Sequence, residues 1–125
     1  MNRKAFTLIE LLVVVVIIGI LAAVGIPKFG NTKSKAYVSA MKSDLRNLIN
    51  AEENFFADSA KYTSNLTQLG FKASTGLVAP AVAVYAGAWT AKNGHTQLAG
   101  IQCGIGVNTT NPIAIVAGEG EPACQ

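Results

Sequence analysis

The stretch that decides the fold is "FTLIELLVVVVIIGILAAVGIP", residues 6–27, an apolar run that contains a single charged side chain, Glu10. Up to Ile26 the run has 21 residues, which as a helix would measure about 31 Å, close to the ~30 Å hydrocarbon core of a bilayer. The apolar region of a secretory signal is shorter, about 7–15 residues. Because Arg3 and Lys4 precede the run, the positive-inside rule predicts a membrane helix with a cytoplasmic N-terminus.

Glu10 is the residue that neither a signal peptide nor a simple anchor explains. A carboxylate at the centre of a membrane helix costs about 2.5–3.5 kcal/mol on insertion scales. Glu10 stands near the start of the run, so its side chain could reach the headgroups and lower that cost. A charge that is kept in an apolar run nevertheless favours a specific partner.

The N-terminal segment resembles the prepilin N-terminus of the type IV pilins. In that family a short basic leader ends before a Phe, and a Glu stands fifth in the mature chain. Here the leader would be "MNRKA", residues 1–5, and the mature chain would begin at Phe6, with Glu10 fifth and Pro27 twenty-second. The residue before the cleavage site is usually Gly in the family, and Ala5 departs from that pattern. The resemblance implies cleavage between Ala5 and Phe6, N-methylation of Phe6, and a helix kink at Pro27.

The same resemblance supplies a partner for Glu10. Cleavage would leave a free α-amine on Phe6, and in a helical assembly that amine can meet the Glu10 carboxylate of a neighbouring subunit. Two opposite charges that are buried together cost far less than either charge alone. The pair would therefore set the register of assembly, because an incoming subunit that fails to pair leaves Glu10 unsatisfied.

The chain beyond the apolar run turns amphipathic. Apolar residues recur there at three- and four-residue steps, which predicts one nearly continuous helix from Phe6 to about Asp58, some ~80 Å long. The stripe comprises Tyr37, Ala40, Met41, Leu45, Leu48, Ile49, Phe55 and Phe56. We expect this stripe to pack under a sheet as core.

The last third of the chain predicts an antiparallel sheet of three or four strands laid on that helix, an α+β fold. The strand-like runs are Leu77–Trp89, Thr96–Val107 and Pro112–Ala117. The Asn-Gly pair within Lys92–His95 predicts a hairpin turn, and Asn108–Pro112 predicts a second turn. Pro80 indicates an edge or irregular start, and the Gly-rich tail from Gly118 predicts no regular element.

Cys103 and Cys124 are the only cysteines, and no CxxC motif is present. If the soluble part is exported, a disulfide between them is favoured over two reduced thiols. Closing a loop of this size is worth about 3 kcal/mol in the chain-entropy model. The resemblance agrees, since pilins carry a C-terminal loop bounded by a disulfide.

No enzyme motif accompanies these features. His95 is the only histidine and adjoins the predicted turn, where we expect it to be solvated. No nucleophile motif, HExxH or phosphate-binding Gly loop is present, so the sequence predicts no catalytic residue, metal or cofactor. Without residues 1–5, eight basic residues face seven acidic ones, which predicts no specific nucleic-acid partner.

The resemblance implies three segments: a cleaved leader at 1–5, a transmembrane and polymerisation helix at 6–28, and a globular domain at 29–125. The implied function is a structural subunit that polymerises with copies of itself into an extracellular type IV pilus for adhesion, motility or DNA uptake. Its implied partners are a prepilin peptidase and methyltransferase, the inner-membrane assembly machinery, and membrane lipid before assembly. The alternatives are a minor pilin, a pseudopilin of type II secretion, and a single-pass anchored binding domain that never polymerises.

Overall fold

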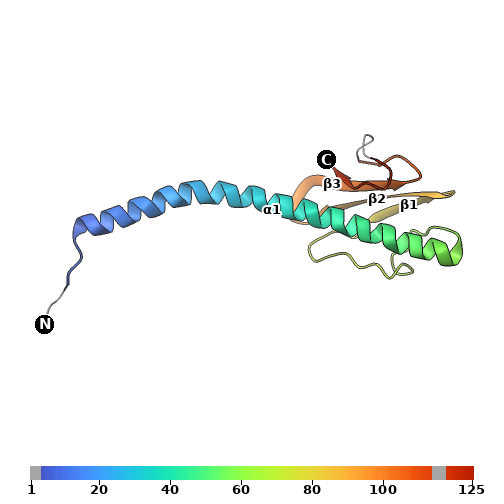
Figure 1. Cartoon of the computed structure of the whole chain (residues 1–125), viewed down its shortest axis with the longest axis horizontal. Helices are drawn as coiled ribbons and strands as arrows, with labels where there is room; N and C mark the ends of the chain where they lie inside the picture. The colour runs from blue at the N-terminus through green and yellow to red at the C-terminus, as the bar shows by residue number, and fades with distance from the viewer. Residues whose placement is uncertain (1–3, 114–117) are drawn as a thin grey trace. The chain divides into compact units, whose positions relative to one another are not determined.

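The computed structural model describes residues 4–113 and 118–125. One helix, α1 (Leu8–Ser59), precedes a sheet of four strands: β1 (Ala81–Tyr85), β2 (Ala88–His95), β3 (Leu98–Val107) and β4 (Ala123–Cys124). In Figure 1 the colour runs along the chain in this order, from blue at the N-terminus to red at the C-terminus. The fold is therefore α+β, as the sequence predicts. Internal contacts divide the chain into two units, residues 1–34 and residues 35–125, which are described separately below.

The first unit is the apolar start of α1. The helix begins at Leu8, two residues later than predicted, and it continues through Pro27 without interruption. Proline in a helix removes one backbone donor, but the neighbouring turns keep their helical geometry in this chain. Its large apolar side chains lie on the outside, so this unit has no core of its own.

The second unit packs the remainder of α1 on an antiparallel sheet with the sequential order β1-β2-β3-β4. The core consists of Met41, Leu45 and Leu48 from the helix and Trp89, Ala91, Cys103 and Ile105 from the strands. The predicted stripe is thus core at its centre, while Phe56 near the helix end is 37% exposed. The segment after the helix also packs against this core, through Tyr62, Leu66, Leu69 and Phe71.

Two predicted strand boundaries are wrong. The run Leu77–Trp89 is not one strand, because Ala86 and Gly87 form the turn between β1 and β2, and Gly87 takes a φ of 75° that suits glycine. Lys92–His95 is not a turn but the end of β2. The chain reverses instead at Thr96 and Gln97. Burial decides this: Asn93 and His95 continue the inward alternation of β2, which a turn at Asn-Gly would expose.

The tail also differs from the prediction. Ala123 and Cys124 form β4, which pairs antiparallel with β3. The tail gains these bonds by lying beside a strand, which its Gly-rich composition could not indicate. Of the predicted strand Pro112–Ala117, Pro112 and Ile113 lie in a bend, and residues 114–117 lie outside the described residues. Pro80 precedes the edge strand β1, as expected.

His95 is not solvated. The residue is only 8% exposed, and its ring stacks on Tyr37 of α1, with ring centroids 4.0 Å apart and planes 20° apart. The backbone N–H of Gln97 donates to His95 Nδ1 at 3.1 Å. The imidazole therefore helps to hold the β2–β3 turn against the helix.

Candidate functional site

The start of α1 is fixed by a reciprocal pair of hydrogen bonds between Thr7 and Glu10. Thr7 N–H donates to Glu10 Oε2 at 2.8 Å, and Glu10 N–H donates to Thr7 Oγ1 at 3.3 Å. The Thr7 hydroxyl also donates to Glu10 Oε2 at 2.8 Å. This is a capping box, in which each residue satisfies a backbone donor that the first helical turn leaves free. Glu10 therefore has a role within its own chain.

Glu10 keeps one oxygen for other contacts. All three bonds with Thr7 leave Oε1 unused, and the residue is exposed. The same end of the chain carries a hollow of about 240 Å³ lined by Lys4, Ala5, Phe6 and Glu10. The structure thus brings the predicted processing residues, Ala5 and Phe6, beside the predicted assembly residue. A carboxylate oxygen near the chain start can accept hydrogen bonds from an amine of another copy.

The helix that follows exposes an apolar surface. The large apolar side chains from Leu8 to Phe29 are between 49% and 84% exposed. The helix is long and apolar enough to cross a membrane, with a mean hydropathy of 3.0 in its best window. An apolar surface of this extent must be covered by lipid or by protein.

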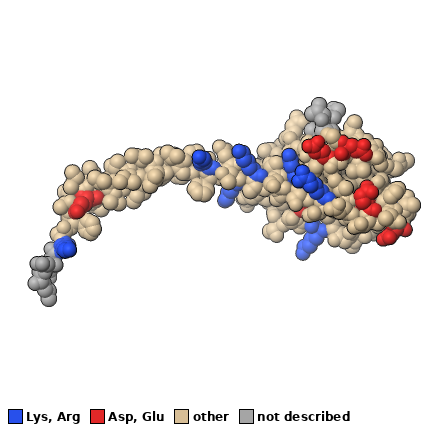
Figure 2. Space-filling model, in the orientation of Figure 1, with Lys and Arg blue, Asp and Glu red and all other residues tan. Residues whose placement is uncertain are grey.

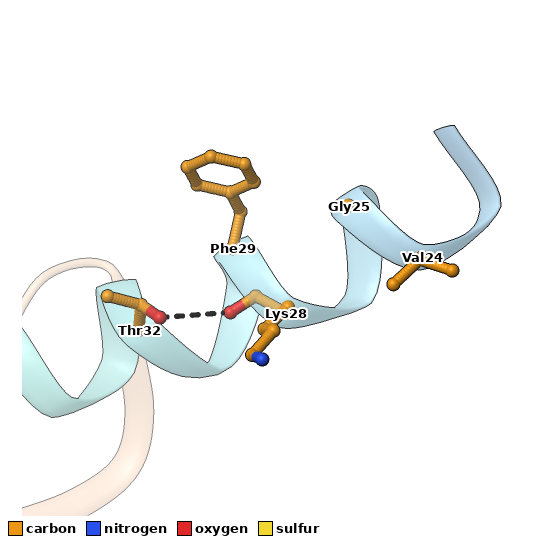
Figure 3. Close-up of a pocket in the computed structure, with 5 residues that line it drawn as sticks. All are labelled: Val24, Gly25, Lys28, Phe29 and Thr32. Atoms are coloured by element: carbon orange, nitrogen blue, oxygen red, sulfur yellow. Dashed lines mark hydrogen bonds between the residues drawn. The ribbon is translucent and has the colours of Figure 1, made fainter. Parts of the chain in front are cut away.

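This surface is not smooth near its end. Val24, Gly25, Lys28, Phe29 and Thr32 line a groove of about 340 Å³, shown in Figure 3. Gly25 offers no side chain there and has nothing within 4 Å of where a Cβ would stand. The Phe29 ring projects away from the helix, and the Thr32 hydroxyl bonds back to the Lys28 carbonyl at 3.0 Å. The groove can therefore receive an apolar side chain of a neighbouring helix.

In the second unit, a disulfide joins Cys103 to Cys124 between β3 and β4. The backbone groups of Gln102 and Gln125 exchange two hydrogen bonds of 2.9 Å beside it. The loop between the two cysteines is clamped by Asn111, whose side-chain amide donates to the Gly104 carbonyl at 2.7 Å. The expected disulfide-bounded C-terminal loop is therefore tied to the sheet by both covalent and hydrogen bonds.

Two buried carboxylates hold the segment after α1. Asp44 accepts bonds from the backbone N–H and hydroxyl of Ser74, at 2.8 and 2.6 Å. Glu52 accepts a bond from the Thr63 N–H at 3.2 Å. Burial raises the pKa of Glu52, the Thr63 bond opposes this shift, and the neighbouring Glu53 adds to it. Both carboxylates therefore have a structural role, because their hydrogen bonds hold the segment after α1 against the helix.

Three of these roles were missed by the sequence reasoning. Thr7 could have been found, because T-x-x-E before an apolar run is the sequence signature of a capping box. Asp44 and Glu52 carried no comparable signal, since charged residues on a long helix are usually solvated. Among residues 4–113 and 118–125, no group of three or more His, Cys, Asp or Glu side chains is placed to hold a metal ion.

Comparison with known proteins settles the family. The prokaryotic N-terminal methylation motif matches residues 1–26. The chain is 35% identical over 102 residues to the type IV wide pilus major component PilA4 of Thermus thermophilus, a match that covers 79% of this chain and 74% of that protein. The chain belongs to the type IV pilin family.

Two other relatives show how far this likeness extends. The pilin is 40% identical over 75 residues to the type IV major pilin protein PilA of Myxococcus xanthus, a match that covers 60% of this chain and 34% of that protein. It is 39% identical over 72 residues to the type II secretion system core protein G of Pseudomonas aeruginosa, with 58% and 49% covered. The matches thus span a third to a half of these two relatives.

Proposed function

We propose that this pilin is the structural subunit of an extracellular type IV pilus and polymerises through its N-terminal helix. The observation that carries the proposal is the exposed apolar start of α1, headed by a Glu10 whose second oxygen is uncommitted. Before assembly, lipid of the inner membrane covers this surface, and in the fibre other copies of the helix cover it. The relatives support this role, since they include major pilus components.

Maturation precedes assembly in this proposal. A prepilin peptidase cleaves between Ala5 and Phe6, and a methyltransferase adds one methyl group to the new amine of Phe6. The match of residues 1–26 to the methylation motif supports both steps. The methylated amine keeps its positive charge, so it can pair with Glu10 of an adjacent copy. Intact-mass analysis of fibres should therefore find a chain that lacks residues 1–5 and carries one added methyl, and a chain that begins at Met1 would contradict this.

The role of Glu10 is tested by two substitutions that differ in whether the capping box can still form. Glu10→Gln keeps an oxygen that can cap the helix but removes the charge, whereas Glu10→Ala removes both. If pairing with the Phe6 amine drives assembly, both variants enter the membrane and are cleaved, yet yield few fibres. If the carboxylate serves only as a cap, Glu10→Gln forms fibres like the parent, and only Glu10→Ala is impaired. Glu121→Gln, at an exposed position of the C-terminal segment, is the control for loss of a negative charge.

The second candidate is a pseudopilin of a type II secretion system. It is favoured by the match to core protein G. Fibre preparations sheared from cells separate the two, because a major pilin is their main component, whereas a pseudopilin stays with the cell envelope. A single-pass protein that never polymerises gives no fibre, either in the sheared preparation or in the cell envelope.

A further inference from the structure

The charged side chains of the sheet-bearing unit are not paired with one another. Among residues 4–113 and 118–125, no salt bridge within 4.0 Å joins a basic to an acidic side chain. Surface helices often carry Glu and Lys at i, i+4 spacing, which gives local pairs. Here the exposed charges are instead sorted by sign along the second half of α1, so they are free to pair with another molecule.

The basic part of this pattern is a stripe on one face of the helix. Lys35, Lys42 and Arg46 follow each other at steps of seven and four residues, which places them within about 40° of each other around the helix axis at 100° per residue. Lys35 and Arg46 are exposed and Lys42 is partly exposed, whereas the core face carries Met41 and Leu45. We call Lys35, Lys42 and Arg46 the basic stripe.

The acidic part lies at the end of the same helix. Glu53 stands seven residues after Arg46, and the Tyr62 hydroxyl donates to its Oε1 at 3.1 Å. Glu119 of the C-terminal loop is close enough to Tyr62 that its charge raises the pKa of that phenol, after the larger effects of burial, of Glu53 and of Glu52. We call Glu53, Asp58 and Glu119 the acidic end.

The acidic end carries three carboxylates, and Lys61, two residues after the end of α1, is a single cation that does not balance them. Figure 2 shows the same separation on the visible face of this unit. Blue side chains lie mainly along the helix, and red ones gather over the C-terminal end of the helix and the C-terminal loop. The two signs are therefore separated along the helix axis, with the cations nearer the first half of this unit and the carboxylates nearer its end.

We propose that the basic stripe of one copy pairs with the acidic end of the next copy and so fixes the axial offset between neighbouring subunits. The proposal rests on the proposed polymer, in which all copies enter the membrane in one orientation and their helices run parallel. In-register parallel neighbours would place like charges opposite each other, which is unfavourable. An offset of seven, eleven or eighteen residues brings Glu53 opposite Arg46, Lys42 or Lys35, at about 10, 16 or 27 Å.

Two different complementary surfaces on one chain produce a head-to-tail contact. Such a contact gives an open helical filament when its rotation does not close into a ring. The apolar helix supplies the general attraction between copies, which has little preference for axial position. The charge pattern supplies that preference, because only certain offsets match opposite signs.

Charge exchange in the full-length chain tests the inference. Glu53→Arg alone should lower the yield of sheared fibres by about threefold to tenfold at low salt, and so should reversal of the one basic residue that lies opposite Glu53, since each turns an attraction into a repulsion at every interface. The double exchange of Arg46→Glu with Glu53→Arg should restore the yield if Arg46 is the residue opposite Glu53. The corresponding doubles with Lys42 and Lys35 test the other two offsets, so the pair that restores assembly identifies the offset.

Two controls exclude simpler explanations. Lys92→Glu changes charge equally at an exposed site of β2, off the stripe, and should keep the parental yield. Membrane level and formation of the Cys103–Cys124 disulfide report folding of every variant. If Glu53→Arg assembles like the parent, or if no double exchange restores yield, the pairing is wrong. If the parent chain itself forms no fibre, the proposed function has failed instead.

Discussion

Reduction of the Cys103–Cys124 disulfide should destabilise the sheet-bearing unit by an amount that the structure specifies. The two cysteines are 21 residues apart. In the chain-entropy model, a loop of this length removes about 11 cal/mol/K from the unfolded ensemble, or about 3.3 kcal/mol at 25 °C. Reduction is preferable to substitution because Cys103 is fully buried, and replacing it by Ala would add the cost of a cavity.

The tail determines whether the full loss is observed. β4 has only two residues, and two backbone hydrogen bonds between Gln102 and Gln125 extend its pairing. If the reduced tail stays docked, the cross-link acts mainly on the unfolded chain and the loss is about 3 kcal/mol. If the tail detaches, the loss is limited to the free energy of docking it, which a strand of this length keeps small. Hydrogen exchange of the Gln102 amide distinguishes these outcomes.

The assay uses the only tryptophan, Trp89, which is fully buried in the core. Urea unfolding of the whole chain in detergent micelles, followed by Trp89 fluorescence, reports on the sheet-bearing unit. With a slope of about 1–3 kcal/mol/M, a loss of about 3 kcal/mol lowers the midpoint by about 1–3 M. Equal midpoints for the oxidised and reduced chains, with the Gln102 amide protected in both, would refute the loop-closure reasoning.

Three other predictions follow from single contacts. Gly106→Ala should destabilise the unit by about 1–3 kcal/mol, because a Cβ would stand 2.6 Å from the Thr109 carbonyl oxygen, whereas Gly94→Ala meets nothing closer than 3.9 Å and serves as the control in urea unfolding. The parent should lose stability as the pH rises above 4.5, because burial raises the pKa of Glu52 and the unfolded chain therefore releases this proton at a lower pH than the folded chain does. Glu52→Gln should abolish this loss. A parent whose stability is level from pH 4 to 7 would contradict the prediction. Thr7→Ala should cost the helix start about 0.5–2 kcal/mol and Thr7→Ser much less, seen as loss of amide protection in the first turn; equal protection in both variants would argue against the cap.

How much of the fold the sequence predicts depends on how local each signal is. The long helix and its apolar stripe follow from periodicity within one segment, and the structure has both the helix and, in the core, the centre of the stripe at Met41, Leu45 and Leu48. The turn between β2 and β3 was misplaced because Asn-Gly is a strong local signal that burial of Asn93 overrides. β4 exists only because a distant strand and a disulfide hold it. Neither the burial of Asn93 nor the pairing of β4 can be recognised from the local sequence of the segment concerned.

The same distinction explains the candidate site. The leader, Phe6 and Glu10 were found together because their spacing is a continuous motif, but the motif does not say what Glu10 does inside one chain. Asp44 and Glu52 bind Ser74 and Thr63, residues that lie in a loop with no periodicity, so the pairing could be seen only in the folded structure.

The capping box also answers why a carboxylate can stand in a membrane-bound helix before any partner arrives. Glu10 occupies the first turn, where the helix dipole favours a negative charge. Its Oε2 already accepts bonds from the Thr7 backbone and hydroxyl, so part of the cost of removing the charge from water is offset within the chain. The remaining oxygen is unsatisfied, and an amine of the next copy would complete it. In the proposed assembly, such a subunit would remain in the bilayer until it adds to a fibre, where the second oxygen would gain a partner. Glutamine would keep the cap but could not pair with the amine, which is why the Glu10→Gln variant separates the capping role from the assembly role.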